Sequence, residues 1–191
     1  MAAKPRVLIV GDSISIGYTP QVAELLAAEA QTLHNPGNGG DSDNVLQNLP
    51  GWLAEVPADV VHLNCGLHDV KFHRDPPRIQ VPLERYRDNL RRIVQRLREG
   101  GSAVVWANST PVIESRHTAV KEFDRFNRDV DAYNAAAEAI VSEARLCIND
   151  LHGVVVSAGP ETVICEDGVH MREEGSHMLA RAVADCLRRF L

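Results

Sequence analysis

The sequence is poor in aromatic residues and has no long apolar run. Phe, Trp and Tyr together make up 5% of its 191 residues. No apolar stretch approaches the roughly 18 residues that are needed to span a bilayer. The apolar stretch Val7 to Val10 is also too short for the apolar region of a signal peptide. We therefore expect a cytoplasmic protein with no membrane partner.

The sequence also lacks the usual marks of metal-binding and nucleic-acid-binding proteins. Its four cysteines form no C-x-x-C pair, which disfavours a zinc ribbon or a redox motif and predicts buried free thiols. Lys and Arg are mixed with Asp and Glu along the chain, with a formal net charge of −6. Without a basic stripe, a nucleic-acid partner is not expected. We expect neither a metal nor an organic cofactor, and the sequence does not predict an oligomeric state.

Apolar runs of strand length alternate with segments of helical period. Strands are expected at 6–10, 58–64, 102–107 and 146–149, and helices at 20–30, 43–55, 83–99, 126–144 and 175–190. Continuous apolar strands that alternate with helices indicate a parallel sheet covered on both faces. The sequence therefore predicts a single α/β domain over residues 1–191, built as a three-layer α/β/α sandwich around a central parallel sheet.

Three segments without a regular pattern are expected to be loops, at 35–42, 70–82 and 110–123. In open parallel sheets, the loops at the carboxyl ends of the strands build the ligand site. The three segments either follow or face those ends. We therefore look for functional residues near them.

A serine follows the first strand directly, in Gly11-Asp12-Ser13-Ile14-Ser15. This position places Ser13 at the rim of the sheet, where a following helix offers N–H groups that stabilise negative charge. Taken alone, a Gly-Asp-Ser tripeptide is more often a simple turn. Ser13 therefore needs partners elsewhere in the chain to be read as a nucleophile.

A suitable pair occurs near the other end, in Asp167-Gly168-Val169-His170. A nucleophilic serine needs a base to accept its proton, and that base needs an acceptor that fixes its tautomer. A carboxylate three residues before a histidine can reach the imidazole ring. An isolated D-x-x-H is more often an unrelated pair of loop residues.

Two further segments supply candidate oxyanion donors. Asn35 to Ser42 is rich in glycine, and its backbone N–H groups are free to point at a developing negative charge. The second segment, Asn64-Cys65-Gly66-Leu67-His68-Asp69, directly follows a predicted strand. Together the four segments supply a nucleophile, oxyanion donors, a base and a group that orients the base.

These four segments resemble the sequence blocks of the GDSL or SGNH hydrolases. Gly11-Asp12-Ser13-Ile14-Ser15 matches the first block, whose serine is the nucleophile, and Gly40-Asp41-Ser42 looks like the second, whose glycine provides an oxyanion N–H. Gly66-Leu67-His68-Asp69 stands where the third block, G-x-N-D, belongs, and Asp167-Gly168-Val169-His170 matches the last block, D-x-x-H. The resemblance extends from Val7 to about Leu187.

The resemblance implies a flavodoxin-like SGNH hydrolase fold and a serine esterase. Its catalytic residues would be Ser13, Asp167 and His170, and its oxyanion hole would comprise Ser13, Gly40 and His68. No G-x-S-x-G motif occurs in the chain, which argues against the arrangement of the α/β-hydrolases.

His68 departs from the family pattern, because asparagine usually stands at this position. A neutral imidazole still donates through one ring N–H, so we interpret His68 as a substituted oxyanion donor. Two alternatives stay open: His68 points away and the N–H groups of Ser13 and Gly40 suffice, or the site is degenerate and binds without turnover.

The low aromatic content and the polar loops favour a small-molecule substrate, a short-chain ester such as an acetyl ester of a small polar or carbohydrate alcohol. Asp12, which is expected to fix the turn, and His117 are candidate substrate contacts. Lys71, Arg74 and Arg78 form a basic cluster that is expected to be solvated rather than to bind a carboxylate.

Three alternatives to this function remain. They are a lysophospholipase or thioesterase of the same family, a non-catalytic binding module on the same fold, and a metal-dependent hydrolase that uses Asp12, His68, Asp69 and His170. The metal alternative is disfavoured because the sequence has no H-E-x-x-H spacing.

Overall fold

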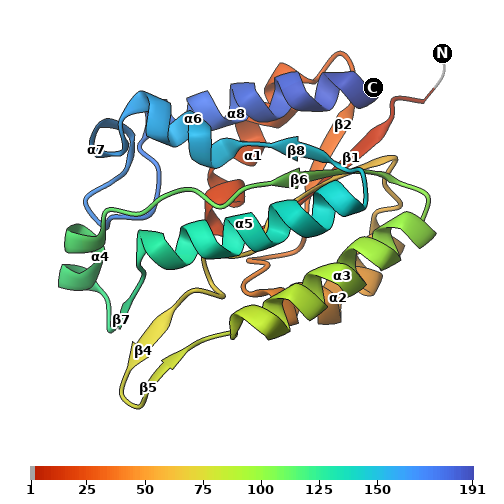
Figure 1. The fold of residues 1–191 in the computed structure, drawn as a ribbon. Coiled ribbons are helices and arrows are strands. Elements are labelled where there is room, and N and C mark those ends of the chain that lie inside the picture. Colours follow the sequence, from red (N-terminus) through yellow and green to blue (C-terminus); the bar gives the residue numbers. More distant parts are fainter. Residues whose placement is uncertain (1–2) are drawn as a thin grey trace.

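The computed structural model describes residues 3–191, in which a parallel sheet lies between two layers of helices (Figure 1). This confirms the predicted α/β class. The main sheet has five parallel strands in the order β2-β1-β3-β6-β8. The strands are β1 (Arg6–Val10), β2 (Gln31–His34), β3 (Val60–Leu63), β6 (Ala103–Ala107) and β8 (Cys147–Asn149). The central strands are mostly apolar, with the buried His62 in β3, because helices cover them on both faces.

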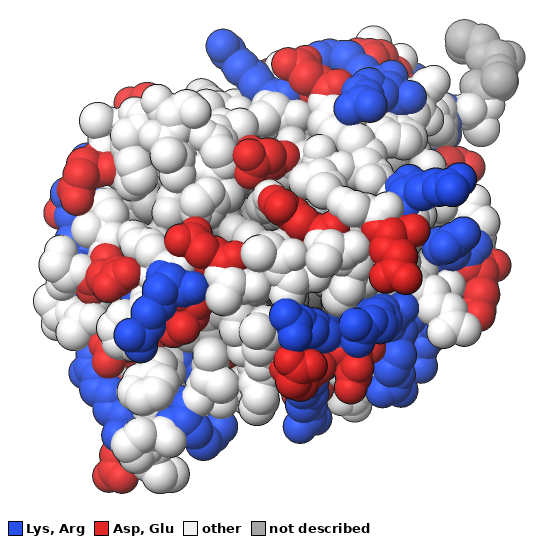
Figure 2. Space-filling view, in the orientation of Figure 1, with Lys and Arg blue, Asp and Glu red and all other residues white. Residues whose placement is uncertain are grey.

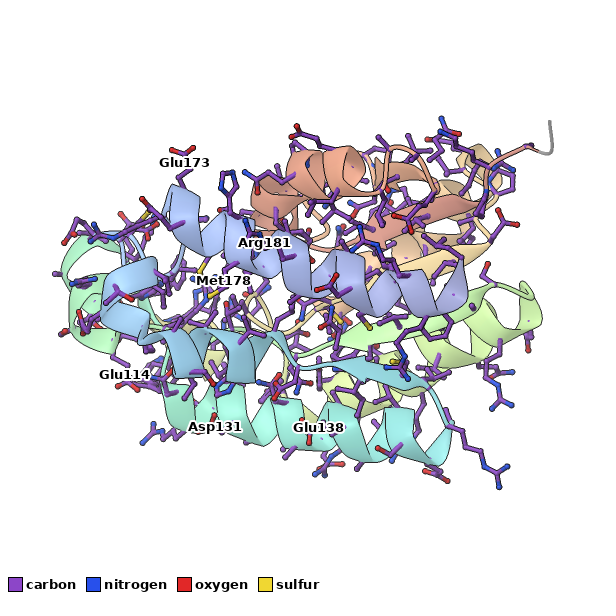
Figure 3. The ribbon with its side chains drawn as sticks, turned by 90° about the horizontal axis from the view of Figure 1, so that it is seen from above. Glu114, Asp131, Glu138, Glu173, Met178 and Arg181 are labelled. Carbon is purple, nitrogen blue, oxygen red and sulfur yellow. The ribbon has the colours of Figure 1, made fainter. Side chains whose placement is uncertain are left out.

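Helices from both ends of the chain form one covering layer. It contains α1 (Ser13–Leu25), α6 (Leu151–Ala158), α7 (Pro160–Val163) and α8 (Glu173–Leu187), which a 3₁₀ turn at Arg188–Phe190 follows. Figure 3 looks onto this layer and shows α1 and α8 side by side, with Glu173 on the first turn of α8 and Met178 toward α6. The ends of the chain therefore pack together over the same face of the sheet.

The opposite layer contains α2 (Ser42–Glu55), α3 (Leu83–Glu99) and α5 (Asn127–Glu143). The bounds of α3 agree with the prediction, because its apolar residues recur with helical period. Tyr86, Leu90, Ile93 and Leu97 are buried, whereas the outer face carries arginines. In Figure 2, Lys and Arg side chains along α3 are interspersed with Asp and Glu.

The start of the chain differs from the prediction. Helix α1 begins at Ser13 rather than at Pro20, because the Asp12 carboxylate accepts a hydrogen bond from the N–H of Ile14 and caps the helix. Pro20 lies inside the helix. Strand β2 was not predicted, since Gln31–His34 lies at the edge of the sheet and mixes polar with apolar residues.

A second, antiparallel sheet lies where the sequence predicted only loops. Its strands are β4 (Phe72–Arg74), β5 (Pro77–Ile79) and β7 (Phe123–Asp124), and α4 (Glu114–Val120) precedes β7. Arg74 and Asp124 hold β4 against β7, with 2.9 Å between Nε and Oδ2 and 2.6 Å between Nη2 and Oδ1. These hydrogen bonds lower the pKa of Asp124 to about 2. The predicted basic cluster is therefore divided, because Arg74 is engaged with a carboxylate.

Over residues 3–191, none of the helices combines the length and the apolar character that crossing a bilayer requires. The four cysteines are free, as predicted, but only Cys65 is buried; Cys147, Cys165 and Cys186 are partly exposed.

His62 in β3 is a fully buried imidazole. Its Nε2 lies 3.1 Å from the Asn149 amide nitrogen, and its Nδ1 has no partner among residues 3–191. Burial lowers the pKa of His62 to about 4, compared with about 6.5 in an unfolded chain. Between these two pH values the unfolded chain binds a proton that the folded chain excludes. The free energy of unfolding should therefore fall as the pH drops from about 6.5 to about 4.

His62→Gln tests this prediction, because glutamine keeps an acceptor for Asn149 and does not titrate. We expect the variant to lose up to about 3 kcal/mol less stability than the wild type between pH 7 and pH 4. Urea unfolding at both pH values measures the difference. His177→Gln, on the exposed surface of α8, is the matched control, and an equal acid dependence in both variants would contradict the prediction.

Candidate active site

Three residues from the two ends of the chain meet at the carboxyl edge of the main sheet. The Ser13 hydroxyl oxygen, on the first residue of α1, lies 2.9 Å from Nε2 of His170. The other ring nitrogen of His170, Nδ1, forms a hydrogen bond with the carboxylate of Asp167. The structure thus brings together the three predicted catalytic residues in one hydrogen-bonded chain.

The environment of Asp167 fixes the protonation pattern of this chain. Burial alone would raise the pKa of Asp167, but hydrogen bonds lower it to about 2. The donors are the His170 ring and the backbone N–H groups of Val169 and His170, and each backbone bond measures 3.0 Å. An ionised carboxylate only accepts hydrogen bonds, so Nδ1 of His170 carries the proton. The lone pair of Nε2 then faces the Ser13 hydroxyl.

The loop that carries Asp167 and His170 needs glycine at its centre. Gly168 has a φ of +76°, and a Cβ on this residue would lie 2.5 Å from the carbonyl oxygen of Ile113. The Gly168 carbonyl in turn accepts a hydrogen bond from the Ile113 N–H at 2.8 Å. Only glycine combines this left-handed backbone with so close an approach.

The glycine-rich segment 35–42 lies directly against the end of β1. The Gly39 N–H donates to the carbonyl of Gly11 at 2.8 Å, and a Cβ on Gly39 would lie 2.6 Å from that oxygen. This contact brings Gly40 next to the turn of Ser13. The Gly40 N–H donates to Oδ1 of the exposed Asn38 at 2.9 Å. An oxyanion at Gly40 would therefore have to replace the Asn38 side chain as acceptor.

His68 lies in the wall of the same cavity as Ser13 and His170. Its Nε2 is 3.8 Å from the Asp12 carboxylate. Burial lowers the pKa of His68 to about 4, although Asp12 acts in the opposite direction. At neutral pH the ring is uncharged and keeps one N–H, as an oxyanion donor requires.

Asp69, next to His68, anchors the segment Gly40-Asp41-Ser42 through Ser42. Its fully buried carboxylate accepts hydrogen bonds from the N–H of Ser42 at 3.0 and 3.1 Å and from the Ser42 hydroxyl. Burial raises the pKa of Asp69 to about 7, and the bonds from Ser42 oppose this shift. The segments of Gly40 and His68 are thereby tied together.

The metal alternative has no ligand set in the part of the chain that the structure describes. Within residues 3–191, no three His, Cys, Asp or Glu side chains are grouped so that they could hold a metal ion. Asp69, one of the four residues in that alternative, is engaged with Ser42.

A cavity of about 260 Å³ opens beside Ser13 and His170. Asp12 belongs to its wall, as expected for a substrate contact, although its Oδ1 is engaged with the Ile14 N–H at 2.9 Å. Three cationic side chains, Lys71, Lys121 and Arg125, also line it. The sequence did not point to the last two of these residues.

His117 lies behind this wall rather than in it. The residue is 0% exposed, and its Nε2 is 3.0 Å from Nη1 of Arg125. Because a guanidinium group only donates, Nε2 must be the acceptor. Burial and the neighbouring Arg125 lower the pKa of His117 to about 4. Its contact is thus with Arg125, which in turn reaches the cavity.

The comparisons with known proteins agree with this geometry. The model of the GDSL-like lipase/acylhydrolase family matches residues 9–178. GDSL esterase/lipase WDL1 of Oryza sativa subsp. japonica is 26% identical, over 97% of this chain and 78% of that protein. The isoamyl acetate-hydrolyzing esterase 1 homolog of Homo sapiens is 24% identical, over 92% of this chain and 78% of that protein.

Among solved structures, the acetyl xylan esterase AlAXEase shares the fold. Its TM-score is 0.78 at 17% identity, over 95% of this chain and 99% of that one. The family match covers most of the chain, so the chain belongs to the GDSL-like lipase/acylhydrolase family. It is a carboxylic ester hydrolase with a serine nucleophile.

Proposed function

We propose that the chain hydrolyses short-chain esters, acetyl esters above all, of small polar or carbohydrate alcohols, with Ser13 as the nucleophile. The observation that carries this proposal is the hydrogen-bonded chain from Asp167 through His170 to the Ser13 hydroxyl, in the wall of a small cavity. A small-molecule ester is the only partner that this reaction requires.

In the first step, Nε2 of His170 accepts the Ser13 proton as the hydroxyl oxygen attacks the ester carbonyl. Asp167 stabilises the imidazolium that forms. The negative charge on the carbonyl oxygen is held by the N–H groups of Ser13 and Gly40 and by the ring N–H of His68. His170 then protonates the departing alcohol, which leaves an acyl group on Ser13.

In the second step, water replaces the alcohol. His170 takes a proton from the water molecule, which attacks the acyl carbonyl through the same oxyanion site. Collapse of the second intermediate returns the proton to Ser13 and releases the carboxylic acid. Each step thus uses the same three side chains.

The size of the cavity supports a short acyl group. Its volume of about 260 Å³ lies just below the roughly 300–1,000 Å³ of pockets that enclose drug-sized ligands. Two similar proteins, an isoamyl acetate-hydrolyzing esterase homolog and an acetyl xylan esterase, are named after acetyl esters, which supports this substrate class as well.

Covalent labelling tests the assignment of Ser13. We expect a fluorophosphonate to modify the wild-type chain once, at Ser13, and to leave Ser13→Ala unlabelled, because the Ser13 hydroxyl contacts the base His170 in the wall of the cavity. Mass spectrometry of the labelled peptide gives the site.

Ser15→Ala is the matched control for this experiment. Ser15 also contacts a histidine, with 2.7 Å between its hydroxyl oxygen and Nε2 of His34, but it is buried. We expect the control to be labelled like the wild type. Like the wild type, it should also hydrolyse p-nitrophenyl acetate faster than p-nitrophenyl octanoate. Labelling that persists in Ser13→Ala would refute the assignment.

A further inference from the structure

Three cationic side chains gather in the wall of the cavity next to Ser13. Lys71 precedes β4, while Lys121 and Arg125 flank β7, so all three belong to the segments of the small antiparallel sheet, whose strands are labelled in Figure 1. Within residues 3–191 none of them forms an ion pair with a carboxylate, whereas Arg74 of the same sheet is paired with Asp124. On the face shown in Figure 2, by contrast, most Lys and Arg side chains have acidic neighbours.

Arg125 is the most deeply buried of the three, with 5% of its surface exposed. Its Nε donates to the carbonyl of Leu67 and its Nη1 to the neutral ring of His117, but Nη2 has no acceptor in the described part of the chain. Both partners orient the guanidinium group without neutralising it. Neither partner carries the negative charge that a buried cation ordinarily has beside it, so Nη2 can donate to a negative group in the cavity.

Two of the cations contact the ring of Phe123. The Lys71 ammonium and the Arg125 guanidinium each lie 5.1 Å from the centre of this ring. Burial, and then the charge of Arg125, lower the pKa of Lys71, and Asp41, Asp12 and Asp69 oppose this shift. An anion bound near both groups would offset the repulsion between them.

Carboxylates also surround these cations. Asp12 and Asp167 act on Arg125, and Asp41, Asp12 and Asp69 act on Lys71. Among the described residues, Asp12 is the only one of these carboxylates in the lining of the cavity. The lining itself therefore carries three cationic side chains and one carboxylate.

We propose that the substrate is an ester that itself carries a carboxylate, and that Arg125, Lys71 and Lys121 bind this carboxylate while Ser13 attacks the ester carbonyl. The guanidinium group suits the planar, two-oxygen geometry of a carboxylate. This inference rests on the proposed function of the same site and defines its substrate class more narrowly.

Two pairs of esters with matched shape test the inference. In each pair a carboxylate replaces an isopropyl group of the same branched form. The first pair, 3-acetoxypropanoate and isoamyl acetate, places the charge on the alcohol. The second pair, monoethyl succinate and ethyl 4-methylpentanoate, places it on the acyl group. Acid release in a pH-stat gives kcat/KM for all four compounds.

We expect the charged member of at least one pair to be hydrolysed about 10-fold or more faster in kcat/KM, the size of one or two charge-assisted hydrogen bonds. The pair that shows the preference identifies the side of the ester that carries the carboxylate. Added salt should weaken the preference. Equal or slower hydrolysis of both charged esters would overturn the inference.

Two substitutions of the partly exposed Lys121 test whether these cations cause the preference. Lys121→Gln should reduce the ratio of charged to neutral kcat/KM several-fold, and Lys121→Glu should abolish or reverse it. Arg92→Glu, on the exposed face of α3 outside the cavity, makes the same change of net charge and should leave the ratio unchanged.

The two proposals fail in different ways. Fluorophosphonate labelling of Ser13 with turnover of neutral esters, but without a preference for the charged ones, would sink the carboxylate site alone. Absence of both labelling and turnover of all four esters would sink the proposed function as well. A preference that survives Lys121→Glu would show that these cations do not bind the charged group.

Discussion

Replacing His170 with alanine is expected to lower kcat for p-nitrophenyl acetate by about 10⁶-fold, the loss found when the base is removed from a serine triad. The reason is that Nε2 of His170, 2.9 Å from the Ser13 hydroxyl, is the acceptor of its proton. Asp167→Asn should lower kcat by about 10⁴-fold, because an amide favours the wrong tautomer of His170. Steady-state kinetics of purified variants measures both effects.

Asparagine is chosen at position 167 because its carbonyl oxygen still accepts the N–H groups of Val169 and His170. The loop should therefore keep its shape. His177→Ala removes a histidine from the exposed face of α8 and should leave kcat unchanged. A loss of less than tenfold in His170→Ala would contradict the assignment of the base.

Replacing His68 with alanine should lower kcat by about 10²-fold with little change in KM. One oxyanion donor contributes about this much, and it acts mainly in the transition state. His68→Asn should retain activity within a few-fold of the wild type, since the asparagine amide also donates. Because the pKa of His68 is about 4, the wild type and the Asn variant should share one pH profile between pH 5 and 8.

Equal kcat in the wild type and both variants would contradict the donor role. The backbone N–H groups of Ser13 and Gly40 would then hold the oxyanion alone. Equal losses in the Ala and Asn variants would instead show that the imidazole ring has a role that an amide cannot replace. Fluorophosphonate labelling of each variant confirms that Ser13 is still reactive.

The elements with strong periodicity could be predicted from the sequence. Helix α3 has apolar residues at regular helical spacing, and β1 and β3 consist mostly of apolar residues, as burial on both faces requires. The start of α1 was missed because Pro20 resembles a first helical residue more than Asp12 resembles a cap. The short strand β7, Phe123–Asp124, has too few residues to show alternation, and its partner in β4 lies far away in the sequence.

The same distinction applies to the candidate site. The motifs of Ser13, Asp167 and His170 are weak singly, but together they match a known family, so these residues could be predicted from the sequence. Lys121 and Arg125 carry no motif. Their role depends on which cationic side chains are paired with carboxylates in the folded chain. That pairing is set by long-range contacts such as the one between Arg74 and Asp124.

In the proposed mechanism, the groups that bind the charged part of the substrate and the groups that react lie in different parts of the fold. Ser13 begins α1, and Asp167 and His170 lie in the segment before α8, whereas Lys71 and Phe123 belong to the segments of β4 and β7. Directed evolution confined to the cavity-facing positions of this small sheet should change the substrate preference while the catalytic residues keep their positions. The same arrangement allows natural substitutions in the small sheet to change the substrates of such an enzyme while its catalytic residues are retained.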